Sequence, residues 1–193
     1  MDKRKQLVTT AFSLFYRHGI HAVGINEILK QAQVAKKTLY KHFSGKEALV
    51  EAVLSYRDER YVAWLQGRVE LATPGIEGIM ALFDAMDDWF NNRVETLDSF
   101  NGCFFINTCS EYGDPDCVPH QLCKQHKDKV KALIVSQLQQ TMLSQARQAE
   151  LADAVLLLKE GAIVMAQVQG DRGAAMKAKQ FCKNLLRDAA LSH

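Results

Sequence analysis

The chain has 193 residues, of which 48% are hydrophobic and 24% are charged. This ordinary globular composition excludes a disordered or fibrous protein. The longest apolar run, near 154–158, is far shorter than the roughly 20 residues that a membrane span needs. The basic N-terminus also lacks the apolar segment of a signal peptide. We therefore expect a cytoplasmic protein with no membrane partner.

The positive charge is concentrated at the N-terminus, although the net charge is only +2. Residues 1–46 hold nine Lys and Arg against two acidic residues, whereas the remaining chain holds fifteen against twenty. A basic head on a mildly acidic body indicates that an anionic polymer binds the head.

Apolar residues recur at three- and four-residue spacing, and no segment alternates as a strand would, so the fold class is predicted to be all-α. The first helix is expected over 2–18, followed by Gly19 as a left-handed C-cap. Two short helices are expected at 25–32 and 36–43, separated by a tight turn at Gln33. Ser44 and Glu47 form the pattern of a capping box that opens a long helix to about residue 71.

The rest of the chain is predicted to hold five more helices. Pro74 is expected at the first position of the next helix, a place that suits proline. The expected ranges are 74–93, 99–112, 119–144, 150–169 and 174–190.

Two short helices joined by a tight turn behind a supporting helix predict a helix-turn-helix. At 3.6 residues per turn, Leu39 and Phe43 share one side of the second short helix and should pack inward. Basic, hydrogen-bonding and aromatic groups are left on its outer surface, where they can reach phosphates and base edges. These outer residues are Lys36, Lys37, Thr38, Tyr40, Lys41 and His42.

The residues around this motif resemble the N-terminal domain of TetR-type repressors over about residues 3–55. The resemblance is carried by the run TLYKHF at Thr38–Phe43, followed by KEAL from Lys46. Gln33 and Ala35 depart from the Gly and the Ser or Thr that such proteins usually have there.

The resemblance implies a fold of a helix-turn-helix domain (1–48) and a helical effector-binding and dimerisation domain (49–193). It also implies a transcriptional regulator, expected to be a repressor that a small-molecule effector releases from palindromic operator DNA. Lys36, Lys37 and Thr38 would lie nearest the bases. The implied phosphate contacts are Ile25, Asn26, Thr38, Tyr40, Lys41 and Lys46.

The last two predicted helices carry a dimerisation signal, because the 150–169 segment is apolar on nearly every side and must be covered. TetR-type proteins pair their last two helices, which implies a homodimer here. The residues we expect at the dimer interface are Val155, Leu158, Ala162, Ala166, Phe181 and Leu185.

The middle helices are expected to enclose the effector, since pockets between bundle helices are common. Cys103, Asn107 and Glu111 are spaced by four and form a polar stripe that could orient a ligand or bond neighbouring helices. The predicted ligand-binding residues are Met86, Trp89, Phe90, Phe100, Cys103, Phe104, Asn107, Glu111, Tyr112 and Met165.

Three alternatives remain open from the sequence. A thiol-sensing repressor could use Cys103 or Cys109, provided that the thiol is accessible and has a lowered pKa. A hydrolase using Cys and His is a second class, but no phosphate-binding glycine loop, nucleophile elbow or HExxH motif occurs, so we expect neither an enzyme nor a cofactor. A helical adaptor that binds only protein is a third class, against which the basic head argues.

Four possible metal ligands, Cys117, His120, Cys123 and His126, recur every third residue. A spacing of three drifts by about 60° per step on a helix, so the four cannot chelate one ion. Cys117 lies before Pro119 and could fold back, which leaves a site of three ligands at best, so we expect no metal site.

Overall fold

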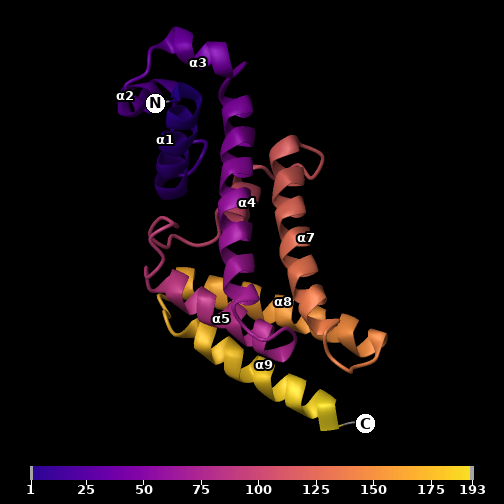
Figure 1. The fold of residues 1–193 in the computed structure, drawn as a ribbon. Helices are drawn as coiled ribbons and strands as arrows, with labels where there is room; N and C mark the ends of the chain where they lie inside the picture. Colours follow the sequence, from indigo (N-terminus) through magenta and orange to yellow (C-terminus); the bar gives the residue numbers. More distant parts are fainter. Residues whose placement is uncertain (1, 192–193) are drawn as a thin grey trace. The chain divides into compact units, whose positions relative to one another are not determined.

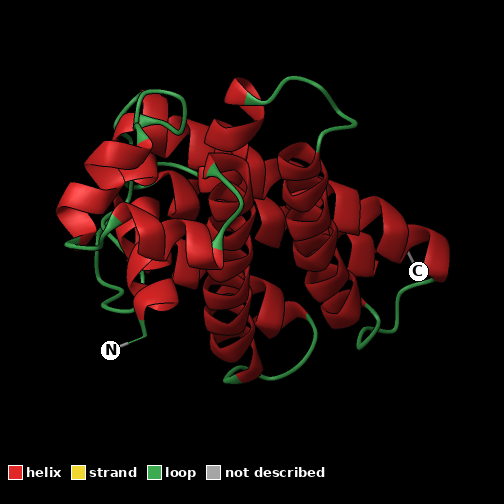
Figure 2. Ribbon diagram, turned by 90° about the horizontal axis from the view of Figure 1, so that it is seen from above, coloured by secondary structure: helices red, strands yellow, loops and turns green. Residues whose placement is uncertain are grey.

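The computed structural model describes residues 2–191, with side chains as far as Arg187. Within that range every regular element is a helix, which confirms the all-α prediction (Figures 1 and 2). The helices are α1 (Lys3–His18), α2 (Ile25–Ala32), α3 (Lys36–His42), α4 (Lys46–Glu70), α5 (Ile76–Phe90), α6 (Phe104–Glu111), α7 (Val118–Leu138), α8 (Gln145–Val168) and α9 (Ala174–Leu191). None of these described helices is long and apolar enough to cross a membrane.

The three N-terminal helices match the predicted ranges to within a residue. Asp2 caps α1, because its carboxylate accepts a hydrogen bond from the Arg4 backbone N–H at 2.9 Å. Gln33 ends α2 in the left-handed conformation (φ 51°, ψ 45°), which costs roughly 1 kcal/mol in a residue with a Cβ. Gly19 also has a positive φ of 87°, but its ψ of 156° is extended rather than left-handed helical. The chain therefore continues in an extended conformation from the end of α1 to Ile20, which is buried.

Two predicted helix starts, those of α5 and α6, are wrong, and a glycine with a positive φ angle lies just before each helix. Pro74 does not open α5, because Gly75 adopts φ 104° and the helix begins only at Ile76. The helix predicted from residue 99 begins at Phe104, because Gly102 has φ 79° and Cys103 is extended.

The predicted capping box at the start of α4 is also not formed. α4 begins at Lys46, two positions after Ser44. The Glu47 carboxylate accepts a hydrogen bond from the Tyr112 hydroxyl at 3.0 Å instead of turning back toward Ser44.

The end of α7 and the start of α8 differ from the prediction as well. α7 ends at Leu138 rather than near residue 144. Ser144 caps α8 by accepting from the Arg147 backbone N–H, so that α8 begins at Gln145, five residues before the predicted start.

The described chain folds into two compact units. The N-terminal unit comprises the residues up to Arg60 together with Cys103–His126, and the C-terminal unit comprises Tyr61–Gly102 together with the residues from Lys127 on. Helices α4 and α7 contribute to both. The predicted boundary at residue 48 separates domains by function, whereas the two units are defined by compactness. The boundary therefore stays a prediction.

Candidate functional site

Helices α2 and α3 form the helix-turn-helix, supported by α1 in the N-terminal unit. Leu39 is fully buried, and Phe43 and Val34 are buried beside it, as the spacing predicts. The Gln6 side-chain amide also donates to the Ala32 backbone oxygen at 2.7 Å, which ties the end of α2 to α1. The apolar side of α3 thus packs against the rest of the head, and the residues on its other side face outward.

The outward side of α3 carries the polar residues that the sequence assigned to DNA. Tyr40 is 49% exposed even though it is aromatic. None of the nine predicted DNA-contact residues is buried: Asn26, Lys36, Lys37, Tyr40 and Lys41 are exposed, and Ile25, Thr38, His42 and Lys46 are half-buried. Their contact with DNA stays a prediction.

Two cations beside this motif, Arg4 and the already assigned Lys46, lie over aromatic rings. The Arg4 guanidinium lies 5.3 Å from the centre of the Phe43 ring, and the Lys46 ammonium lies 6.0 Å from that of Phe15. Arg4 is absent from the residues that the sequence assigned to DNA, although the basic run at positions 3–5 was the available signal. These contacts add positive charge next to α3 without requiring an acidic partner.

The predicted ligand residues fall on both compact units. Those on the C-terminal unit include an aromatic cluster, in which the Phe100 ring lies 4.9 Å from Trp89 and 4.8 Å from Phe90 between ring centres. Arg172 covers the Phe100 ring at 5.0 Å and donates a hydrogen bond to the Phe90 backbone oxygen. Met86 is buried in this unit, whereas Met165 is 36% exposed.

On the N-terminal unit, the predicted ligand residues Glu111 and Tyr112 form hydrogen bonds with other parts of the same unit. The Glu111 carboxylate accepts hydrogen bonds from the backbone N–H groups of Ile20 at 2.7 Å and His21 at 2.6 Å. Burial and the bond to Glu47 raise the pKa of Tyr112 above its ordinary value. Glu111 therefore holds the loop that joins α1 to α2, a capping role that the sequence left open beside ligand binding.

The other three predicted residues of this unit are Cys103, Phe104 and Asn107. Cys103 and Phe104 are buried, and Asn107 is half-buried. The Phe104 ring meets the Phe12 ring edge to face at 5.3 Å. The role of this set in binding an effector stays a prediction.

A buried polar group inside the N-terminal unit was missed by the sequence reasoning. The Nδ1 atom of His126 lies 2.8 Å from Asp58 Oδ1, and the His126 ring stacks on Phe105 at 3.6 Å. Arg57 is 2% exposed and lies over the rings of Phe12 and Tyr16. The available signal was the charged pair at 57–58, which interrupts the apolar stripe of α4.

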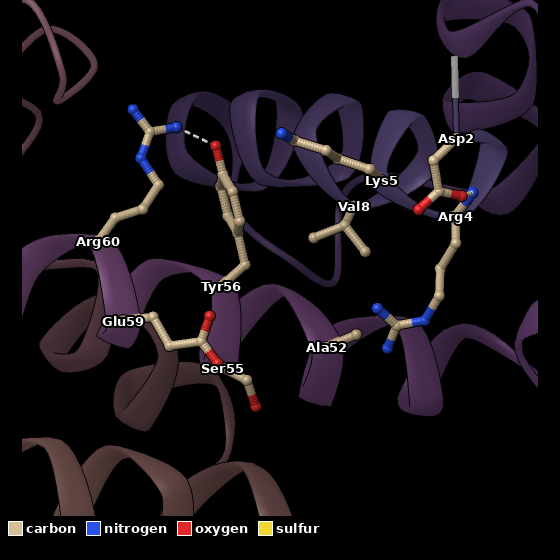
Figure 3. A pocket seen from close by; sticks show the side chains of 9 residues that line it. All are labelled: Asp2, Arg4, Lys5, Val8, Ala52, Ser55, Tyr56, Glu59 and Arg60. Atoms are coloured by element: carbon tan, nitrogen blue, oxygen red, sulfur yellow. Dashed lines mark hydrogen bonds between the residues drawn. The ribbon is translucent and has the colours of Figure 1, made fainter.

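A cavity of about 640 Å³ lies between α1 and α4 in the N-terminal unit. Figure 3 shows charged side chains projecting into it from both helices. Its lining comprises Asp2, Arg4, Lys5, Val8, Ala52, Ser55, Tyr56, Glu59 and Arg60. It is open and charged, and therefore unlike the mostly apolar pockets that usually hold small molecules.

The cysteines and histidines that the sequence singled out differ in their burial and partners. Cys103 is 5% exposed, and burial raises the pKa of Cys182 to about 12. The Nδ1 atom of His120 lies 2.9 Å from the Tyr112 backbone oxygen. Among the described residues, no group of three or more His, Cys, Asp or Glu is arranged to hold a metal ion.

The predicted dimerisation residues divide into two sets. Val155, Ala162 and Ala166 are buried within the chain itself, and Leu158 is half-buried. Large apolar side chains are nevertheless exposed on the same two helices. They are Leu157, Val164, Met165 and Val168 on α8 and Met176, Phe181 and Leu185 on α9.

A helix-turn-helix head with a basic outer face, joined to a wholly helical body, defines a DNA-binding transcriptional regulator. Residues 7–53 match the model of the tetR family of bacterial regulatory proteins. Residues 76–180, more than half of the chain, match the C-terminal domain of LmrA/YxaF-like transcriptional regulators. The chain belongs to the TetR family, as the motif resemblance indicated.

Individual relatives agree with this assignment. The regulator LmrA of Bacillus subtilis is 25% identical over 165 residues, which cover 85% of this chain and 86% of LmrA. The repressor ComR of Escherichia coli is 29% identical over 108 residues, so that the match spans about half of each chain. A TetR-family regulator from Streptomyces coelicolor has a similar structure, with a TM-score of 0.83, 29% identity and coverage of 97% of this chain and 95% of that one. The family consists of regulators rather than enzymes.

Proposed function

We propose that this protein is a cytoplasmic repressor that binds a palindromic operator as a homodimer and leaves it when a small molecule binds the body. The observation that carries the proposal is the outer face of α3. Four of its seven residues are Lys or His, and Tyr40 is 49% exposed among them. The opposite face is anchored by the fully buried Leu39.

The exposed side of α3 suits the major groove of DNA, which is wide enough for one helix. Lysine and tyrosine side chains donate hydrogen bonds to phosphate and base oxygens. We assign Lys36, Lys37 and Thr38 to the bases, because they occupy the N-terminal turn of the recognition helix. Tyr40 and Lys41 are assigned to the phosphates.

The exposed apolar residues of α8 and α9 support the proposed homodimer. Leu157 is 74% exposed and Phe181 is 63% exposed, and burying one large apolar side chain contributes about 1.5–3 kcal/mol. Apolar surface on two neighbouring helices is typical of a protein–protein interface. A two-fold dimer would set two recognition helices about 34–36 Å apart, one turn of DNA.

Effector control is proposed from the family and from the helical body. An effector can release DNA only if it binds the DNA-free state more tightly than the bound state. The relatives are named both as repressors, such as ComR, and as activators, such as FasR of Mycolicibacterium smegmatis. Repression is therefore the part of the proposal that needs a transcription measurement.

The proposal is tested by footprinting the DNA upstream of the protein's own gene with purified protein. We expect protection of a palindrome whose half-sites lie one helical turn apart, and loss of transcription from the overlapping promoter in vitro. Increased transcription from the same site would replace repression by activation. Absence of a protected palindrome there and in DNA fragments selected from the whole genome would contradict the proposal.

A further inference from the structure

A lysine lies in the middle of the apolar face of α8. Lys159 is 1% exposed, and it shares the buried stripe of the helix with Val155, Ala162 and Ile163, each within one turn. It is the only buried lysine among the described residues. Burying an ammonium group costs several kcal/mol unless it is well paired.

The pairing of Lys159 is incomplete. Its Nζ atom donates to Glu160 Oε1 at 2.9 Å, and Lys127 donates to the other oxygen of the same carboxylate at 2.6 Å. An ammonium group has three N–H donors, and among the described residues Glu160 is the only acceptor bonded to Lys159. The one carboxylate of Glu160 thus bonds both lysines, and Lys159 is the more deeply buried of the two.

Glu160 is ionised and firmly held in this arrangement. Burial raises its pKa, but the charges of Lys159 and Lys127 and their hydrogen bonds outweigh burial and lower the pKa to about 2. Lys127 also neutralises the Glu160 carboxylate. Lys159 can therefore direct its remaining donors at a second anion while Glu160 keeps a cationic partner.

The other ion pairs between helices of the C-terminal unit are different. Lys131 pairs with Asp153 at 2.7 Å, but their side chains are 46% and 61% exposed. Such exposed pairs contribute about 0–1 kcal/mol and need no special explanation. A methionine or leucine would fill the position of Lys159 without the cost of desolvation.

We propose that Lys159 is the residue that receives the anionic group of the effector, and that the effector is an organic carboxylic acid with an apolar body. An apolar body is favoured because Lys159 shares its side of α8 with the buried apolar residues Val155, Ala162 and Ile163. The inference rests on the proposed effector control and adds the chemical class of the effector to it.

The proposal is tested by calorimetric titration without DNA. The probes are 1-naphthoate, 4-phenylbutyrate and decanoate, each compared with its own primary amide. We expect the wild-type protein to bind at least one acid ten times or more tightly than the matching amide. Lys159→Met should weaken binding of that acid by ten- to a hundredfold, because a hydrogen bond between two charged groups is lost. Binding of the amide should be unchanged.

Two further variants separate charge from packing. Lys159→Arg keeps the positive charge and should retain the preference for the acid. Lys131→Met removes a lysine from an exposed pair on the neighbouring helix and should bind the acid as the wild type does. If Lys159→Met does not fold, as judged by circular dichroism, the Arg variant and the comparison of acid with amide still decide the question.

Equal binding of every acid and its amide by the wild type would overturn the proposal. Unchanged acid binding in a folded Lys159→Met protein would overturn it as well. Because these titrations contain no DNA, they are independent of operator binding. A protein that binds the acid through Lys159 but protects no operator would reject the proposed repression alone.

Discussion

Helices α3 and α8 use opposite arrangements of charged and apolar residues. Helix α3 exposes its lysines and buries Leu39, whereas α8 buries Lys159 and leaves Leu157 74% exposed. Helix α3 thus follows the ordinary amphipathic pattern, whereas the exposed apolar surface and the buried charge of α8 are both unfavourable for an isolated chain in water. We have proposed a molecule outside the chain for each of these features: DNA for the exposed cations of α3, a second copy for the exposed apolar side chains of α8 and an anion for its buried lysine.

The largest effect is expected at two neighbouring residues of α3, of which Leu39 packs in the core and Tyr40 is proposed to bind DNA. Leu39→Ala removes a fully buried side chain and should lower the free energy of unfolding by about 2–5 kcal/mol. Tyr40→Ala, at a 49% exposed position, should change it by no more than about 0.5 kcal/mol and weaken operator binding roughly tenfold. Urea denaturation and DNA titration of both variants test the contrast. Equal destabilisation by the two changes would show that Tyr40 belongs to the core of the head.

The exposed apolar face of α8 and α9 offers the second contrast. Phe181→Glu places a charge on a side chain that is 63% exposed, so the monomer should stay folded while the dimer dissociates. Operator affinity should fall more than a hundredfold, because each half-site is then bound separately. Gln139→Glu adds the same charge at an exposed position just after α7 and serves as the control. Analytical ultracentrifugation that finds an intact Phe181→Glu dimer would place the interface elsewhere.

A smaller effect is expected from the pH dependence of the buried lysine cluster. Glu160 has a pKa of about 2 in the folded chain, below its ordinary value of 4.5. A carboxyl group with a lowered folded-state pKa contributes stability above its unfolded pKa and loses it as the pH falls. We expect this contribution, on the order of 1–3 kcal/mol, to disappear between about pH 5 and pH 2.

Thermal denaturation from pH 7 to pH 2 measures that contribution. The Glu160→Gln protein should lose less stability over this range than the wild type, because the Gln side chain does not titrate. Asp153→Asn, in the exposed pair with Lys131, is the matched control and should resemble the wild type. Identical pH profiles of the wild type and Glu160→Gln would mean that Glu160 is not held by its two lysines.

The fold of the head could be predicted from the sequence because its signals are local. The spacing of Leu39 and Phe43 and the turn at Gln33 depend on residues within one or two turns, and both predictions are confirmed. The starts of α5 and α6 could not be predicted, since they depend on the positive φ angles of Gly75 and Gly102. These glycines contact distant side chains: the Gly75 backbone N–H donates to Gln137, and the Gln167 side chain lies against Gly102.

The candidate sites were predictable to different degrees. The outer residues of α3 follow from helix geometry alone, whereas Val155, Ala162 and Ala166, predicted at the dimer interface, are buried within the chain. An apolar residue does not reveal whether its own chain or a partner covers it. Lys159 was visible as a charge within an apolar stripe, but only the structure shows that it shares Glu160 with Lys127.

The central claim, that the outer face of α3 holds operator DNA, is tested most directly by the salt dependence of operator binding. Each phosphate contact contributes about 0.9 to the slope of log K against log salt concentration. We expect a steep slope for the wild type and, for Lys41→Ala, a slope that is smaller by about 2, because the dimer loses one phosphate contact in each half. Lys183→Ala, at an exposed position on α9, should leave the slope unchanged. Binding that does not respond to salt, or equal slopes for the wild type and Lys41→Ala, would contradict the account.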